Sequence, residues 1–500
     1  LHDVLPISFH SGVHEILLIA FALAWAQFLG TGGAPIVIDV EGHGRQEELG
    51  DAEVDLSRTV GWFTAKYPVS LEVGGLRWAQ VVAGDAALGA VVKNAKEQLR
   101  GLPDGLTYGL LRYLNADVDL DEADPPIGFN YFGRLGAATA YASGDVWRFS
   151  QEGPSLTGAA GAVPMALLHT VELNAVTIDT DTGPHLNANW TWAPSALDRT
   201  AVTRVSRLWF DALAGICAHV RRGGGGLTPS DITPAGLSQQ QIDELCQHYR
   251  IADMLPLSPL QQGLLYHASI ANGSGDDVYA VQLDIALSGP LDQHRLREAV
   301  QTVVNRHPHL AALFCAQFDQ PVQIIPADPV MAWRYIDLDG GRADPGGGAG
   351  IEEQIEQLCA AERAAVCDLP DQPAFRAALI HVAENRHRFV LTAHHIVLDG
   401  WSMPILLREI FASFTGRWLP AAGSFRRFVS WLAERDLDAA HAAWRAVLAG
   451  FDTPTLVGPP GRAGRGQRGV ESFQVSKETT RALGELARSR HRSEERRVGK

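Results

Sequence analysis

Apolar and polar positions alternate along the chain with two different periods, which predicts strands and helices in succession. Short runs rich in β-branched and aromatic residues have the pattern of buried or half-buried strands. They are PIVIDV (35–40), TVELNAVTID (170–179), LNANWTW (186–192), YAVQLDIALSG (279–289) and FRAALIHVAENRHRFVLTAHHI (375–396). Helical patterns lie between these runs. The succession predicts an α/β fold in α+β layers, with mixed sheets flanked by helices.

The most apolar segment, His14–Gly30 (HEILLIAFALAWAQFLG), predicts a single helix. Its continuous apolar part runs from Ile16 to Trp25 and a few residues beyond. That length falls short of the roughly 20 residues that span a bilayer. We therefore expect a helix buried in a protein core, and no membrane partner.

Composition narrows the class of protein. The 500 residues suffice for two or three domains with sizeable cores, and 46% hydrophobic with 20% charged residues is typical of a soluble globular chain. A net charge of −15 with no basic face argues against nucleic acid as a partner. Five scattered cysteines without a CxxC pair suit a reducing cytoplasm, and offer neither a zinc site nor a disulfide framework.

Glycine and proline mark one boundary inside the chain. The segment RRGGGGLTPSDITPAGLSQQQIDEL (221–245) predicts a flexible-to-extended linker that closes with a short helix starting near Ser238. Two further Gly/Pro-rich stretches, 340–350 and 458–469, predict surface loops or a crossover between lobes. The chain therefore divides into two halves, each with its own strands and helices.

The segment HHIVLDGWS (394–402) carries candidate chemistry. An apolar strand, RFVLTA (388–393), leads into His394 and His395, and Asp399 and Gly400 follow before a helical pattern. Neutral imidazole is a natural general base for an amine or alcohol nucleophile, and Gly400 would let the backbone turn sharply near a ligand. A pair of satisfied core histidines is the plainer interpretation. Zinc is another, although adjacent strand residues point to opposite faces and cannot easily share one ion.

The pattern HHxxxDG resembles the active-site signature of condensation domains of nonribosomal peptide synthetases, in the chloramphenicol acetyltransferase-like superfamily. Three further segments resemble motifs of the family in the same order: LPLSPLQQGLLYH (255–267), RHPHLAALF (306–314) and FRRFVSWLAERD (425–436), followed by WRAVLAGFDTPTLV (444–457). The resemblance makes His395 catalytic and gives Asp399 a structural ion pair. Ala311 stands where the family usually has arginine, so we expect Arg306 to be the partner of Asp399.

The first half resembles the later motifs of an epimerization domain. EGHGR (41–45), DLSRTVGWFTAKYPV (55–69), PDGLTYGLLRY (103–113) and GFNYFGR (128–134) follow one another in that order. Glu41 is the candidate base or acid, because a partly desolvated carboxylate at a strand end has a raised pKa. The resemblance places Asn130 and Tyr131 near the active site, where they would orient the intermediate. A surface carboxylate remains the alternative for Glu41, and Trp62 and Phe63 are expected in the core.

The resemblances imply a fragment of two domains. Residues 9–222 resemble the C-terminal lobe of an epimerization domain, 223–249 form the linker, and 250–490 resemble the N-terminal lobe of a condensation domain with the start of its second lobe. Residues 1–8 and 491–500 resemble translated sequencing adapters, so we exclude both from the fold. Two acetyltransferase-like lobes, with mixed sheets flanked by helices and a Gly/Pro-rich connection, are the expected architecture.

The implied function is L-to-D epimerization of a carrier-bound aminoacyl or peptidyl thioester, followed by peptide bond formation. Peptidyl carrier domains and an adjacent adenylation domain would be the partners. The phosphopantetheine arm would come from the carriers, and we expect no bound cofactor or metal. A free-standing acyltransferase of the same superfamily, a catalytically inert fragment and a metal hydrolase are the alternatives.

Overall fold

The computed structural model describes most of the chain. The described residues are 5–45, 48, 49, 52, 53, 56, 58–118, 120, 123–135, 167–180, 183–271, 278–338, 350–453, 455 and 471–489. The expected tail 491–500, and most of the expected loops 340–350 and 458–469, lie outside this set. Residues 1–434 form one compact unit and 435–500 another, in which α13 (Leu437–Val447) and α14 (Lys477–Ser489) are described.

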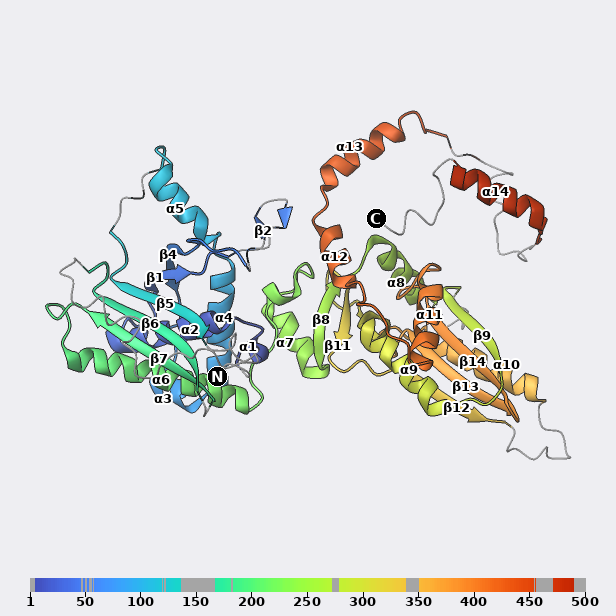
Figure 1. Ribbon diagram of the computed structural model, residues 1–500, viewed down its shortest axis with the longest axis horizontal. Coiled ribbons are helices and arrows are strands. Elements are labelled where there is room, and N and C mark those ends of the chain that lie inside the picture. Colours follow the sequence, from blue (N-terminus) through green and yellow to red (C-terminus); the bar gives the residue numbers. More distant parts are fainter. Residues whose placement is uncertain are drawn as a thin grey trace. The chain divides into compact units, whose positions relative to one another are not determined.

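The first half of the larger unit is built on a mixed five-stranded sheet (Figure 1). Its strand order is β4 (Ala65–Leu71), β1 (Ile36–Gly42), β5 (Ile127–Leu135), β6 (Val171–Thr180) and β7 (Gly183–Trp192). The central pairs β1–β5 and β5–β6 are parallel, and both outer pairs are antiparallel. The helices of this half are α1 (Leu5–Phe9), α2 (Val13–Leu29), α3 (Trp78–Ala83), α4 (Ala86–Arg100), α5 (Gly105–Leu114) and α6 (Arg199–Arg221).

Helix α2 forms the centre of the first core. Every residue from Ile16 to Trp25 is buried, as expected from its continuous apolar run. The indole of Trp209, on α6, donates from Nε1 to the backbone carbonyl of Leu17 at 3.1 Å. The helix ends where Gly30 adopts φ 65°, a left-handed conformation that glycine reaches without steric cost. Among the described residues no helix is long and apolar enough to cross a membrane.

The second half contains two smaller sheets. One is mixed, with strands in the order β12 (Ala332–Asp337), β13 (Phe375–Ala383), β14 (Arg386–His394) and β9 (Ala280–Ser288). The other is antiparallel, in the order β10 (Leu313–Cys315), β11 (Val322–Pro326) and β8 (Ile251–Pro256). Their helices are α8 (Pro259–Ala271), α9 (Gln293–Arg306), η4 (Pro308–Ala311), α10 (Ile351–Ala365), α11 (Ser402–Phe414) and α12 (Phe425–Ala433).

The predicted fold class is confirmed, since both halves are α/β with mixed sheets, and each predicted strand run coincides with observed strands. One core assignment is wrong. Trp62 is 89% exposed, and Phe63 is half-buried beneath the guanidinium of Arg45, whose Cζ lies 4.4 Å from the ring centroid. Both residues lie in a loop before β4, so no strand periodicity directs them inward.

The segment joining the halves is folded rather than flexible. It contains η3 (Pro229–Ile232) and α7 (Gln239–His248), and α7 has Ser238 as its N-cap, where the short helix was predicted. Its apolar side chains pack with Met254 of β8 and with β11 residues in one buried cluster. Ile232, within this segment, has no exposed surface. The predicted flexible-to-extended stretch is therefore wrong for 227–237, because its apolar residues are buried in a small core, whereas the short helix predicted near Ser238 is confirmed.

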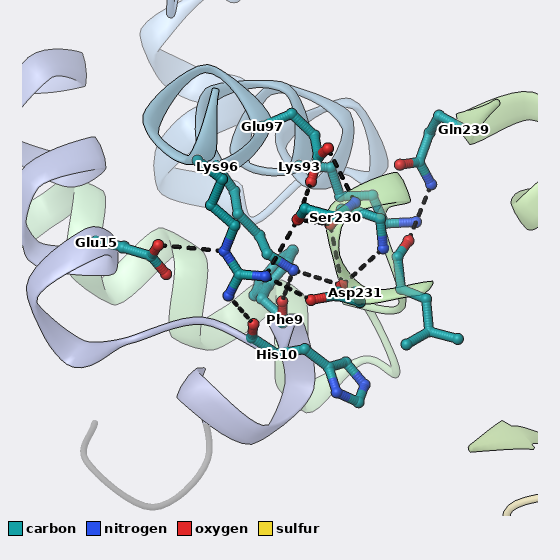
Figure 2. Close-up of polar contacts among 12 residues, drawn as sticks. Phe9, His10, Glu15, Lys93, Lys96, Glu97, Ser230, Asp231 and Gln239 are labelled. Atoms are coloured by element: carbon teal, nitrogen blue, oxygen red, sulfur yellow. Dashed lines mark hydrogen bonds and ion pairs between the residues drawn. The ribbon is translucent and has the colours of Figure 1, made fainter. Parts of the chain in front are cut away.

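The polar side of the same segment contacts α4, as Figure 2 shows. The Lys96 amine has no exposed surface, and its Nζ lies 2.5 Å from Asp231 Oδ2 and 2.7 Å from the carbonyl of Phe9. Arg100 Nη1 donates to the other oxygen of Asp231 at 2.8 Å. Burial lowers the pKa of Lys96, while the nearby amine lowers the pKa of Asp231 against the opposing effect of burial. Both groups therefore need each other to remain charged in this position.

Arg426, on α12, binds the same part of the segment from the second half. Its Nη2 donates to the carbonyl of Asp231 at 2.6 Å, and its Nη1 pairs with the carboxylate of Asp253, on β8. The backbone and the side chain of Asp231 are thus bound from opposite halves. Asp231 therefore links α4 of the first half to α12 of the second.

We predict that Asp231→Asn destabilises the protein by about 3–5 kcal/mol, because it leaves the Lys96 ammonium buried without an anion. Chemical denaturation of the purified chain measures this loss. The matched control is Asp243→Asn on α7. Asp243 also pairs with a lysine of α4, Lys93, at 2.7 Å, but its side chain is 48% exposed. That variant should lose at most about 1 kcal/mol; equal losses in both variants would contradict the buried pair's importance.

Candidate functional site

The two adjacent histidines face different environments, as their positions on a strand predict. His394 is the last residue of β14, has no exposed surface, and its backbone N–H donates to the carbonyl of Ala374 at 2.8 Å. His395 follows the strand and is half-buried, and its backbone N–H donates to the carbonyl of Tyr279 at 2.9 Å. Among the described residues no group of His, Cys, Asp and Glu could hold a metal ion.

Hydrogen bonds determine which nitrogen of His395 carries the proton. Its Nδ1 lies 3.2 Å from the carbonyl oxygen of Leu398, which can only accept, so Nδ1 carries hydrogen and donates. In the neutral ring Nε2 then has a free lone pair. Nε2 has no hydrogen-bond partner among the described residues and is not fully buried. This tautomer is suited to a general base or hydrogen-bond acceptor.

The turn after His395 is supported from the opening motif of the second half. Gln261 is buried, and its Nε2 donates to the carbonyl of Ile396 at 2.8 Å. Its Oε1 accepts from the backbone N–H of Ser258 at 2.9 Å, which is the capping-box arrangement at the start of α8. The side chain of Gln261 thus joins the N-terminus of α8 to the turn at residues 395–400, called here the histidine turn. Gln261 is not among the predicted site residues, although the Ser-Pro-Leu-Gln spacing is the signal of such a cap.

Asp399 organises the loop in a different way from the one predicted. Its Oδ1 accepts from the backbone N–H of Ser402 at 2.8 Å and from the hydroxyl of the same residue at 2.7 Å. Asp399 therefore caps the start of α11. Arg306 instead binds Glu409, with Nε 3.1 Å from Oε2, so the predicted Arg306–Asp399 ion pair is wrong. Arg306 ends α9, which packs against α11, the helix that carries Glu409.

Gly400 has an ordinary backbone and open surroundings. Its φ is not positive, and a Cβ built at this position would meet no atom within 4 Å. The predicted sharp turn therefore does not explain a glycine here. The space next to the turn remains open to a ligand.

A cavity of about 850 Å³ lies elsewhere in the second half. Its walls come from β8, α9, β11 and the start of α12, and they include Asp253, Arg306, His309, Phe425 and Arg426. Burial raises the pKa of Asp253 and lowers that of His309 to about 4. His395 is not one of the lining residues, so this cavity is separate from the histidine turn.

In the first half the structure brings Glu41 and Asn130 together. They are register partners on the parallel strands β1 and β5, and Asn130 Nδ2 donates to Glu41 Oε2 at 2.6 Å. Glu41 is half-buried and lies one residue before the end of β1. Burial and the negative charge of Glu172 raise its pKa. The predicted position of Glu41, half-buried at a strand end, is confirmed, and its role as base or acid stays a prediction.

Tyr131 lies on the other face of the sheet. It follows Asn130 on β5, its ring packs against the first core, and its Oη is 3.1 Å from Thr177 Oγ1. The structure therefore does not bring Tyr131 to the carboxylate of Glu41.

Gly44, in the same motif as Glu41, has φ 59°, and a Cβ there would lie 1.6 Å from the carbonyl oxygen of Phe63. This glycine is required by chain packing.

Comparison with known proteins places the second half in a family. Residues 251–493 match the family described as "Condensation domain". This segment belongs to the condensation-domain family. The histidine turn, Gln261 and the cap formed by Asp399 all lie within the condensation-domain segment.

Relatives align with almost the whole chain. Chondramide synthase cmdD of Chondromyces crocatus is 30% identical over 98% of this chain, and bacitracin synthase 3 of Bacillus licheniformis is 30% identical over 96%. The chain spans only 13% and 7% of their respective lengths. The crystal structure of the epimerization domain from the third module of tyrocidine synthetase B is 22% identical, covering 43% of this chain and 44% of that chain, with a TM-score of 0.32.

We predict that Gln261→Ala destabilises the chain by about 1–3 kcal/mol, because it leaves the Ile396 carbonyl buried without a donor and removes a helix cap. Denaturant unfolding measures the loss. Gln262→Ala is the control, since Gln262 is the same residue type one position later and is exposed, and its side chain donates to the carbonyl of Leu257 at 3.2 Å. The support assigned to Gln261 would be wrong if both variants were equally stable.

Proposed function

We propose that the chain is part of a nonribosomal peptide synthetase in which the condensation-domain segment forms peptide bonds between carrier-bound substrates. The observation that supports this most directly is the tautomer of His395 within that segment. Nδ1 of His395 donates to the carbonyl of Leu398, so Nε2 remains available as an acceptor. The space next to Gly400, in the same turn, is open. The substrates would arrive as thioesters on the phosphopantetheine arms of peptidyl carrier domains, and an adenylation domain would load the acceptor.

In this reaction the acceptor amine attacks the thioester carbonyl carbon of the donor. A C–N bond forms, the C–S bond breaks, and the amine proton finally moves to the departing thiolate. Nε2 of His395 accepts or positions that proton while the tetrahedral intermediate exists. Gln261 binds the backbone of the turn that carries the imidazole, and Asp399 binds the first residue of the helix after it, so both act only on the geometry.

We propose that the first half epimerizes the α-carbon of a carrier-bound aminoacyl or peptidyl thioester from L to D. Glu41 supplies one of the two proton-transfer groups that an inversion requires. Its raised pKa brings its proton affinity closer to that of the weakly acidic α-carbon. Asn130 holds the carboxylate through one oxygen, which leaves the other oxygen for the substrate.

The order of the two halves suggests the stereochemistry of the donor. Residues 9–222 would be the C-terminal lobe of the epimerization domain and 250–490 the N-terminal lobe of the condensation domain. A condensation domain that directly follows an epimerization domain would accept a donor that ends in a D-residue.

We predict that His395→Ala in the intact synthetase reduces peptide bond formation at least a hundredfold and barely changes stability. Loss of a general base typically lowers rates by about 10²–10⁴. Carriers loaded with donor and acceptor, followed by quantification of the released dipeptide, provide the measurement. His441→Ala, at an exposed position of α13, is the control. Undiminished dipeptide with the first variant would show that His395 is not the catalytic group.

We predict that Glu41→Gln blocks exchange of the substrate α-proton with solvent deuterium. The amide of glutamine still accepts a hydrogen bond from Asn130, so the fold should be kept while the proton acceptor is lost. Mass spectrometry of the carrier-bound residue in D₂O follows the exchange. Glu72→Gln, an exposed carboxylate after β4, should exchange normally. Normal exchange in Glu41→Gln would exclude Glu41 as the base.

A further inference from the structure

One face of the first sheet carries a continuous row of polar side chains through Glu41. The register pairs Lys66 of β4 with Glu41 of β1, Glu41 with Asn130 of β5, Asn130 with Asn174 of β6, and Asn174 with Asn189 of β7. Side chains in register on neighbouring strands lie on the same face of a sheet. The opposite face is apolar and packs against the helices of the first core. Glu41 thus lies in a row of polar side chains that crosses all five strands of the sheet.

The next row of this face contains a histidine in place of a strand side chain. Asp39 of β1, Gly128 of β5 and Glu172 of β6 are in register there. The ring of His169 occupies the space above Gly128, where a Cβ would lie 2.6 Å from its Nδ1. Its Nε2 lies 2.8 Å from Asp39 Oδ2, and its Nδ1 lies 3.5 Å from Glu172 Oε2. His169 therefore sits between two carboxylates, one on each side of the glycine.

We propose that His169 is a positioning residue for Glu41: its ring bridges Asp39 and Glu172 and places a positive charge next to the row of side chains that contains Glu41. The electrostatic effect is independent of any reaction. Its catalytic consequence rests on the proposed epimerization, in which the proton affinity of Glu41 decides how readily it takes the α-proton.

The charges around Glu41 make the direction of the effect clear. Glu172 and Asp39 raise the pKa of Glu41, whereas His169 and Lys66 lower it. Hydrogen bonds to Asp39 and Glu172 raise the pKa of His169 to about 9, so the ring is cationic at neutral pH. Lys66 is shared, because its Nζ lies 3.0 Å from Asp39 Oδ2 and 2.7 Å from Asp124 Oδ2. Among the described residues Lys66 forms no ion pair with Glu172, so His169 is the cation that contacts both Asp39 and Glu172.

Two substitutions should shift the pKa of Glu41 in opposite directions. His169→Gln removes a positive charge and leaves Asp39 and Glu172 less compensated, so the pKa of Glu41 rises. Glu172→Gln removes a negative charge, so the pKa of Glu41 falls. A structural disturbance gives a different pattern: opening the site to water weakens the effect of burial and lowers the pKa of Glu41 in both variants.

The experiment is a titration of the Glu41 side-chain carboxyl by ¹³C NMR in the full chain, with the signal assigned by its loss in Glu41→Gln. The expected result is an upward shift in His169→Gln, a downward shift in Glu172→Gln, and no shift in His185→Gln, an exposed histidine on β7. An unchanged or lowered pKa in His169→Gln overturns the proposal. If that variant does not fold, His169→Asn serves instead, and it must raise the pKa of Glu41 because it removes the same positive charge.

The pH profile of α-proton exchange separates this proposal from the proposed function. If Glu41 is the base, exchange rises with pH as its carboxyl ionises, and His169→Gln moves that rise to higher pH. Exchange that survives in Glu41→Gln overturns the role of Glu41 as the base, while the carboxyl titration still decides the role of His169. Exchange that requires Glu41 but keeps its wild-type pH profile in His169→Gln overturns the role of His169 alone.

Discussion

Alternation of side chains between the two faces of a strand governs both candidate sites. At the end of β14 it buries His394 and leaves its neighbour His395 half-exposed. On β5 it directs Asn130 to Glu41 and the adjacent Tyr131 to the core. A shift of one residue in either register would exchange these roles completely. The backbone pairing of the sheets therefore determines which groups are available for chemistry, before any hydrogen bond refines them.

Buried charge is handled in two different ways in the first half. The Lys96 amine is fully enclosed, with one carboxylate and a backbone carbonyl as partners, and its role is to hold two segments together. The His169 ring is shared by two carboxylates in a cluster that also contains Glu41. In the first case burial lowers the pKa of the cation, and in the second the anionic partners raise it. Pairing is structural in one place and electrostatically tunable in the other.

Much of the fold could be predicted from periodicity, and much less of the site. The strand runs, the buried helix from Ile16 to Trp25 and the cap at Ser238 follow from local patterns that need no tertiary information. Local patterns could not predict the partner of Arg306. The arginine binds Glu409 because α9 packs against α11, and that contact between helices is not encoded in a local pattern. His169 lies outside every recognised motif. Its position near Glu41 depends on Gly128, whose missing side chain leaves the space that the ring of His169 fills.

The folded segment between the halves has a practical consequence for recombining this chain with its relatives. Its Gly/Pro-rich composition makes it look like a convenient splice point. A crossover placed between Leu245 and Met254 would nevertheless pair the apolar face of one parent with the β8 and β11 surface of another. A crossover before Asp231 would instead set a foreign α4 against its carboxylate. Chimeras should take α4, residues 227–249 and β8 together from the same parent sequence.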